Sequence, residues 1–301
     1  MKAEEEVMKE FAVQGKDEGK RLDRFMEEQA GWPRSLLMKA LRKKKLKVNG
    51  KNEDPSYRLS REDRIVSFLP EQKRDPDFSV VYEDDQILIV DKKAGILCMD
   101  ITGRTKHTLI DEVNEYLREK NEKPAYMVHR IDFHTSGLMV IAKTEESKKI
   151  LDRLFETGGI RKTYLCTVLG EMKNKSGKLV HYLFKDAKQN RVFLSSEPVK
   201  GAKTAVTEYK VKQIKDGLSL VECRLLTGRT HQIRSQMAHI GYPLLGDDKY
   251  GKKKINKSYG EKGQLLCAWR LSFQTEEGLL AYLNEKSFTV SSVPFQKKYF
   301  S

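Results

Sequence analysis

The residues best able to do chemistry form one polar stretch, residues 129–137, between two apolar runs. Residues 125–128 precede it and residues 137–142 follow it, so the pattern predicts two buried strands with polar side chains at their junction. Polar groups in such a place are costly unless they are paired or used. Arg130 and Asp132 are two residues apart, so an extended backbone points both to one side. We therefore expect Asp132 to act as a nucleophile or a base.

A structural alternative has the same local pattern. An aspartate carboxyl is ionised at neutral pH, and a neighbouring arginine favours that form further. Thr135, Ser136 and Gly137 are residue types that close a turn, so a salt-bridged aspartate in a strand-joining turn would look alike. The remaining chain has to supply the partners that separate the two interpretations.

A second polar stretch, residues 227–234, precedes a helix predicted by apolar residues at i, i+4 and i+7, namely Ile233, Met237 and Ile240. Arg234 would lie one turn into this helix, where its side chain could reach a carboxylate. A glycine-containing turn before a helix also fits anion binding, although the chain has neither a Walker nor a dinucleotide glycine loop. An arginine cluster that binds phosphate or holds the structure is the alternative.

A third stretch, residues 161–168, predicts a strand that carries Tyr164 directly after two basic residues. An aromatic ring beside basic side chains can stack on an unpaired base. A tyrosine packed in an ordinary strand is the alternative for this position.

The elements that position these stretches fall into two predicted domains after an extension, residues 1–17. Residues 18–70 predict a small α/β module of two helices and short strands, and residues 71–77, with two prolines, predict a linker. Residues 78–301 mix strands and helices without regular alternation, which favours an α+β domain on a central mixed, mostly antiparallel sheet.

Charge points to a polyanionic partner. The net charge is +14, and residues 34–51 carry eight lysines or arginines and no acid. The second helix of the module would present a basic face, where we expect RNA contacts from Arg34, Ser35, Lys39, Arg42 and Lys43, with Lys47 on the next strand. A solvated helix face is the alternative.

Composition excludes several other classes. No apolar run reaches the ~18 residues that span a bilayer, and no long helix pairs basic residues with a Trp/Phe face, so we expect no membrane partner. Glu4, Glu5 and Glu6 near the N-terminus do not fit a secretory signal, so we expect a cytoplasmic protein. The four cysteines form no C-x-x-C pair, and we expect them to be buried and reduced.

Taken together, the three polar stretches resemble the RluA-type pseudouridine synthase family, and the resemblance covers about residues 78–297. The matching residues are 129–132 with 135–138; 162–164; 228–234 with 240–241, 243–244, 246–247 and 250–251; and 265–268 with 271–273. The N-terminal module resembles the alpha-L RNA-binding domain, a common companion in this family.

The resemblance implies a role for each matching residue. Asp132 corresponds to the catalytic aspartate, Tyr164 to the tyrosine that stacks on the flipped uracil, and Arg234 to the basic partner of the aspartate. Arg130 would fill the gap left by the extruded uridine, and Leu266 would pack against the base. We also expect His129 and Arg229 to bind substrate.

The implied reaction converts uridine in structured RNA to pseudouridine. No step needs a metal or another cofactor, and we expect a monomer without an obligate protein partner. Large-subunit ribosomal RNA is the first candidate substrate and transfer RNA the second. Phe133, His134, Gln236 and Cys267 depart from the family pattern and leave the subfamily and the RNA target open.

Two other functions would explain part of the sequence. A non-catalytic RNA-binding or ribosome-assembly protein explains the charge but not the polar stretch at Asp132. A metal hydrolase would use His129, Asp132, His134, His231 or His239, although strand alternation sends the first three to different sides and the chain has no H-E-x-x-H helix.

Overall fold

The computed structural model describes residues 9–30, 34–68, 75–100, 102, 105, 107–186, 191–276 and 278–301. The chain divides into two compact units, residues 1–75 and 76–301, and each is described by itself.

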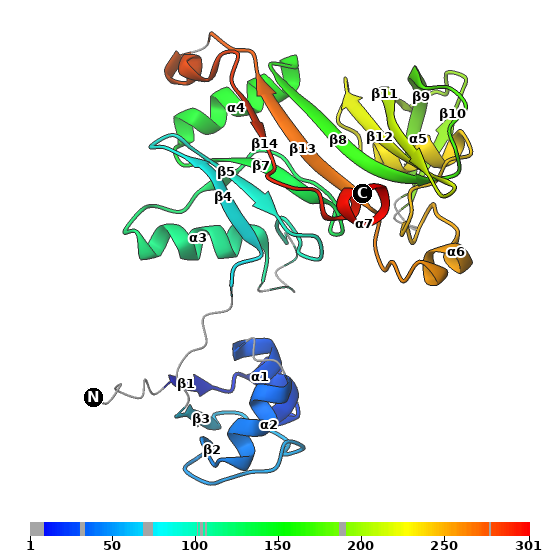
Figure 1. The fold of residues 1–301 in the computed structure, drawn as a ribbon. Coiled ribbons are helices and arrows are strands. Elements are labelled where there is room, and N and C mark those ends of the chain that lie inside the picture. Colours follow the sequence, from blue (N-terminus) through cyan, green and yellow to red (C-terminus); the bar gives the residue numbers. More distant parts are fainter. Residues whose placement is uncertain are drawn as a thin grey trace. The chain divides into compact units, whose positions relative to one another are not determined.

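The N-terminal unit is a small antiparallel sheet with two helices packed against it (Figure 1). Its elements are β1 Lys9–Ala12, the 3-10 helix η1 Gly15–Asp17, α1 Leu22–Ala30, α2 Arg34–Arg42, β2 Leu46–Val48 and β3 Arg64–Ser67. The strands pair in the order β1–β3–β2. One face of each helix is buried in the core, which contains Phe25, Met26 and Leu37. The opposite face of α2 is therefore left to solvent.

Two of the basic residues predicted on the second helix, Lys39 and Arg42, are exposed on α2. Lys43 is also exposed but lies in the turn after α2, because the helix ends at Arg42. Lys47 on β2 holds its ammonium 5.5 Å from the centre of the Phe68 ring. The side chains of Arg34 and Ser35 lie outside the described residues.

The C-terminal unit is built on one large sheet (Figure 1). Its strands are β4 Phe78–Glu83, β5 Ile87–Lys92, β6 Tyr126–Met127, β7 Ser136–Ala142, β8 Ile160–Leu169, β9 Ser176–Asp186, β10 Arg191–Ser195, β11 Lys203–Lys215, β12 Leu218–Leu225, β13 Leu266–Phe273 and β14 Ser287–Thr289. Its helices are α3 Leu109–Glu119, α4 Glu145–Thr157, α5 Gln232–His239, α6 Lys253–Ser258, the 3-10 helix η2 Gly278–Leu283 and α7 Pro294–Phe300.

The sheet has the order β10–β9–β11–β12–β8–β13–β7–β5–β4, with β14 beside β13 and β6 beside β7. Among the described strands, β7 and β13 run parallel and the other pairs are antiparallel. The predicted α+β class with a mixed, mostly antiparallel sheet is therefore confirmed.

Each face of this sheet is covered by its own core. Strand alternation sends Leu88 and Met139 to one face and Ile89 and Val140 to the other. Helices α3 and α5 bury their apolar residues on the first face, whereas α4, η2 and α7 cover the second. Thr144 is the N-cap of helix α4, and its hydroxyl accepts the Ser147 amide at 3.1 Å.

A glycine allows the close strand approach that positions the polar loop. Gly137 pairs with Ala268 where β7 and β13 run parallel, at a φ of +108°. A Cβ at this position would lie 2.3 Å from the Ala268 carbonyl oxygen, so other residues would force the strands apart. This pairing holds residues 128–135, the loop between β6 and β7, beside the start of β13.

The four cysteines are buried free thiols, as the sequence predicts. In the part of the chain that the structure describes, no helix combines the length and the apolar character needed to cross a membrane.

Candidate active site

The three polar stretches meet at one cavity of about 710 Å³ in the C-terminal unit. The loop between β6 and β7 forms one wall, β8 and the end of α4 form another, and the turn after β12 with the start of α5 closes the third. Seven of the predicted site residues line it: His129, Arg130, Asp132, Tyr164, Arg229, Arg234 and Leu266. Segments about a hundred residues apart are therefore joined at this cavity.

Backbone contacts fix the loop on both sides of Asp132. The Cys98 thiol bonds the Ile131 carbonyl oxygen at 3.2 Å, and the Ile131 amide points back to the same sulfur at 3.4 Å. The Gly95 amide donates to the Phe133 carbonyl at 2.8 Å, and the Thr135 amide donates to the Asp132 carbonyl at 3.0 Å. The main chain is thus held in place while the Asp132 side chain remains free to face the cavity.

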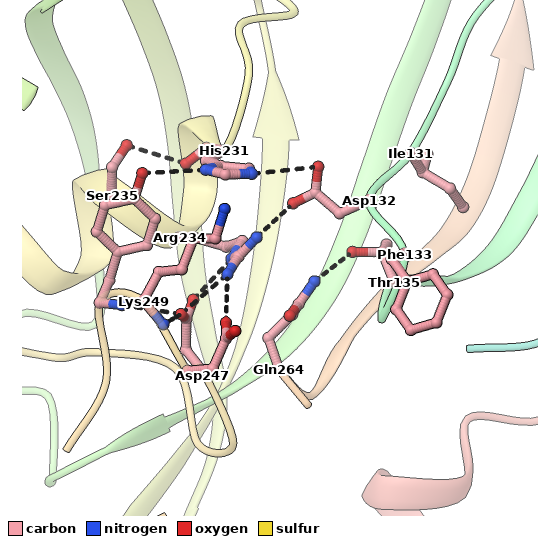
Figure 2. A network of polar contacts seen from close by, with 12 residues as sticks. Ile131, Asp132, Phe133, Thr135, His231, Arg234, Ser235, Asp247, Lys249 and Gln264 are labelled. Atoms are coloured by element: carbon pink, nitrogen blue, oxygen red, sulfur yellow. Dashed lines mark hydrogen bonds and ion pairs between the residues drawn. The ribbon is translucent and has the colours of Figure 1, made fainter. Parts of the chain in front are cut away.

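Asp132 and Arg234 form the central ion pair. Arg234 Nη1 donates to Asp132 Oδ2 at 2.9 Å, across 102 positions of sequence (Figure 2). Arg234 is almost fully buried, and the Asp132 side chain is 27% exposed. One carboxylate oxygen is therefore held by a fixed cation, while the carboxylate still reaches the cavity.

A second acid determines the orientation of Arg234. The Asp247 carboxylate accepts from Nε at 2.7 Å and from Nη2 at 3.0 Å, a bidentate pair in which the acid is fully buried (Figure 2). Burial alone would lower the pKa of Arg234, but Asp247 and Asp132 outweigh it and raise that pKa. Burial likewise would raise the pKa of Asp247, and Arg234 lowers it overall. Arg234 is a permanent cation with two of its nitrogens bound to Asp247 and the third directed at Asp132.

His231 faces the other oxygen of Asp132. Its Nε2 lies 3.9 Å from Asp132 Oδ1, and its Nδ1 is 3.0 Å from the Tyr250 hydroxyl (Figure 2). The residue adopts a left-handed φ of +54° at the N-cap of α5, which aims the ring at the carboxylate. Burial lowers the pKa of His231, so its neutral form is favoured near neutral pH.

Tyr164 and Leu266 form the apolar part of the cavity. Both side chains are buried, and they lie on the neighbouring strands β8 and β13. Burial, followed by the charge of Asp132, raises the pKa of Tyr164. The phenol therefore stays protonated at neutral pH and can donate a hydrogen bond.

The remaining predicted substrate residues differ in their surroundings. Arg130 is exposed at the cavity wall, and Arg229 anchors its Nε to the Thr204 carbonyl at 3.1 Å. His129 Nε2 accepts the Val140 amide at 3.0 Å, and the ring lies 4.5 Å from that of Phe155. Burial and the charge of Lys162 lower the pKa of His129 to about 3. The contacts of His129 with Val140 and Phe155 hold the loop against β7, so we propose that His129 is a positioning residue.

The side chains of the residues that depart from the family pattern make their contacts away from the Asp132–Arg234 ion pair. Phe133 is 42% exposed and meets His134 edge-on at 4.6 Å. His134 packs on Gly263, where a Cβ would lie 2.5 Å from the ring. Gln236 is buried and bonds the Thr207 hydroxyl at 2.6 Å. Burial raises the pKa of Cys267 to about 12, so this thiol is inert at neutral pH.

His231 and Asp132 lie close together, but no three of the described residues considered for a metal hydrolase come close enough to share an ion. Within the described residues, the histidine and acidic side chains close enough to share an ion are Asp77, His107 and Glu112, a different set. The nitrogen of His129 nearest β7 is occupied by a backbone amide.

Sequence reasoning missed three residues of the site. Asp247 lies in a matching motif but received no role, although an acid beside a buried arginine could have been anticipated from that motif. His231 was considered only as a metal ligand. Lys162, two residues before Tyr164 on β8, lines the cavity and also received no role.

Sequence comparisons with known proteins indicate the class of this protein. The model of the RNA pseudouridylate synthase family matches residues 86–239. An uncharacterized RNA pseudouridine synthase of Chlorobaculum parvum is 34% identical over 246 residues, which cover 77% of this chain and 75% of the relative. The ribosomal large subunit pseudouridine synthase C of Escherichia coli is 30% identical over 280 residues, with 87% and 86% covered.

Solved structures show the same fold. Human RNA pseudouridylate synthase domain containing 4 superposes with a TM-score of 0.58 at 19% identity, covering 72% of this chain and 89% of that one. Human RNA pseudouridylate synthase domain containing 1 gives 0.57 at 21%, covering 75% and 96%. These likenesses show the pseudouridine synthase fold, and the family model and the curated relatives show that the chain belongs to the RNA pseudouridylate synthase family.

Proposed function

We propose that this protein converts specific uridines of large-subunit ribosomal RNA to pseudouridine, with Asp132 as the reacting carboxylate. The observation that carries the proposal is the Asp132–Arg234 pair at the wall of a cavity that also contains Tyr164. The ribosomal substrate is supported by the name of the Escherichia coli relative.

The reaction requires the target nucleotide to leave the RNA stack, at a cost of a few kcal/mol. Arg130 is exposed at the edge of the cavity, where it would fill the space that the uridine vacates. The uracil would then lie against Tyr164 and Leu266, whose buried side chains offer an apolar surface and a hydroxyl donor.

The chemistry breaks the bond from ribose C1′ to uracil N1 and forms the bond from C1′ to C5. The proton on C5 leaves, and N1 gains one. Asp132 can attack the sugar or the ring as a nucleophile, or remove a sugar proton as a base. Arg234 would keep the carboxylate oriented through these steps, because it binds one carboxylate oxygen and its own charge is permanent.

Two measurements test the assignment. Large-subunit RNA made from uridine labelled with tritium at C5 should release tritium when incubated with the purified protein. Pseudouridine mapping in cells with and without this protein should show one or a few ribosomal sites that depend on it. Sites confined to transfer RNA would overturn the ribosomal substrate but keep the reaction, and no release from any RNA would overturn both.

A further inference from the structure

Lys162 contributes an ammonium group to the cavity, and the residues that the structure describes provide no counter-ion for it. It lies on β8 two residues before Tyr164, so both side chains face the cavity. Its Nζ lies 5.0 Å from the centre of the Phe155 ring. Among the residues that the structure describes, no carboxylate lies within 4.0 Å of this nitrogen and no hydrogen-bond acceptor is assigned to it. The side chain is only partly exposed, so its charge is incompletely solvated.

Two other lysines of this unit, Lys92 and Lys143, have partners for their ammonium groups. Lys92 is fully buried, and its Nζ donates to the carbonyl oxygens of Lys93 and Ile96, each at 2.9 Å. Lys143 has a side chain that is 9% exposed and pairs with the carboxylates of Glu83 and Glu122 at 3.0 and 2.6 Å. The fold therefore provides acceptors for ammonium groups that it buries for its own stability.

Leaving a desolvated charge without an opposite charge is costly, so a cleft lysine that has no anionic partner among the described residues fits a ligand that supplies one. We propose that Lys162 is an anion site for a backbone phosphate next to the target nucleotide. The inference rests on the proposed function for the position of that nucleotide. It extends that function by assigning a phosphate contact inside the cavity, separate from the basic face of α2.

Two geometric details favour a phosphate over the uracil itself. Lys162 and Tyr164 are about 6.6 Å apart along the strand, on the order of the separation between a base and its backbone phosphate. Gly228 lines the same cavity, and a Cβ there would lie 3.1 Å from Nζ, so the glycine leaves space around the ammonium. A charged hydrogen bond to phosphate would be strong in this partly desolvated place.

A salt titration tests the charge without requiring turnover. Binding of a twelve-nucleotide oligouridylate is measured from low to moderate salt for the wild type and for Lys162→Met. The slope of log K against log salt should fall in magnitude by about 0.7, the value for one phosphate contact on a single strand. Lys254→Met, which removes one exposed charge from α6, is the matched control and should leave affinity at moderate salt nearly unchanged. An unchanged slope in Lys162→Met would overturn the proposal.

A chemical substitution in the RNA locates the contact. In a large-subunit RNA fragment that the wild type converts, one phosphate beside the target uridine is replaced by a neutral methylphosphonate, with a 2′-deoxy sugar on its 5′ side. At one of the two flanking phosphates, wild-type binding should fall about ten- to a hundredfold, the range for a charged hydrogen bond, and Lys162→Met should show no further loss. Equal losses in both proteins at both phosphates would overturn the assignment. Failure of every RNA to be converted would count against the proposed function, whereas the salt titration judges Lys162 separately.

Protein stability separates this role from a structural one. If Lys162 is retained for an anion, Lys162→Met should unfold at a temperature no lower than the wild type, because it removes an unpaired charge. A marked drop in Tm together with an unchanged salt slope would identify the lysine as structural.

Discussion

At the scale of single residues, the site depends on how one guanidinium is shared. Arg234 turns two nitrogens to Asp247 and one to Asp132, so the buried acid determines where the catalytic pair lies. Motif likeness predicted the pairing of Asp132 with Arg234. The motif that contains Asp247 offered an acid as a partner for Arg234, but the bidentate contact across 13 positions depends on side-chain geometry that residue types alone do not give.

We expect Asp247→Asn to lower kcat by about a hundredfold, because a misplaced Arg234 no longer holds Asp132 in its reactive position. Asp248→Asn is the matched control, since Asp248 contacts the same guanidinium at 3.2 Å but has a side chain that is 58% exposed. Its kcat should change little. Tritium release at saturating RNA measures both variants, and equal effects would contradict the orienting role of Asp247.

The lowered pKa of His129 predicts how the free energy of unfolding depends on pH. Its pKa is lowered from 6.5 to about 3 in the folded protein, so between these values the unfolded chain binds more protons. The free energy of unfolding should therefore fall as pH drops through this window, by up to about 1.4 kcal/mol per pH unit. His129→Gln keeps an acceptor for the Val140 amide but does not titrate, so its stability should fall less between pH 7 and pH 5. Parallel urea denaturation curves for both proteins across this range would contradict the assignment.

At the scale of elements, the parallel pairing of β7 with β13 positions the reactive loop. Apolar periodicity predicted α1, α2 and α5, and the apolar runs predicted the strands that flank the reactive loop, β6 and β7. It could not predict which strands pair, since the contact between Gly137 and Ala268 joins segments 131 positions apart. The bond of Cys98 to Ile131 could not be predicted either, because it depends on local packing.

Gly137→Ala should destabilise the protein by at least about 3 kcal/mol, because it combines a left-handed φ with a collision against the Ala268 carbonyl. Gly158→Ala, at the C-cap of α4 with a φ of +82° and open space around it, should cost only about 1–2 kcal/mol. Denaturant unfolding measures both. Similar losses would show that backbone strain alone, and not the strand contact, makes Gly137 necessary.

At the scale of the whole molecule, positive charge is distributed over two units of the chain. The net charge predicted a polyanionic partner, and the comparisons place the chain in a family named for RNA. Composition could not assign the charges to individual contacts. That assignment needs the exposure of each side chain, as on α2, and the absence of an internal partner, as at Lys162.

Reversing charge on α2 and in the turn after it should weaken RNA binding without changing the chemistry. Lys39→Glu with Lys43→Glu, four positions apart, should reduce the salt slope on structured RNA by about 1.8, or about 0.9 for each phosphate contact. The control pair Lys149→Glu with Arg153→Glu has the same spacing on exposed positions of α4 and should reduce it much less. Turnover at saturating RNA should persist in both, and equal slopes would contradict an RNA-binding role for the N-terminal unit.

The most direct test of the central claim is tritium release by Asp132→Asn. The asparagine keeps the size of the side chain and an acceptor for Arg234 but removes the charged carboxylate. We predict no release above background while RNA affinity stays within about threefold of wild type, because the contacts that bind phosphate are intact. Measurable turnover by this variant, with mass spectrometry showing that the asparagine has not deamidated, would contradict the account.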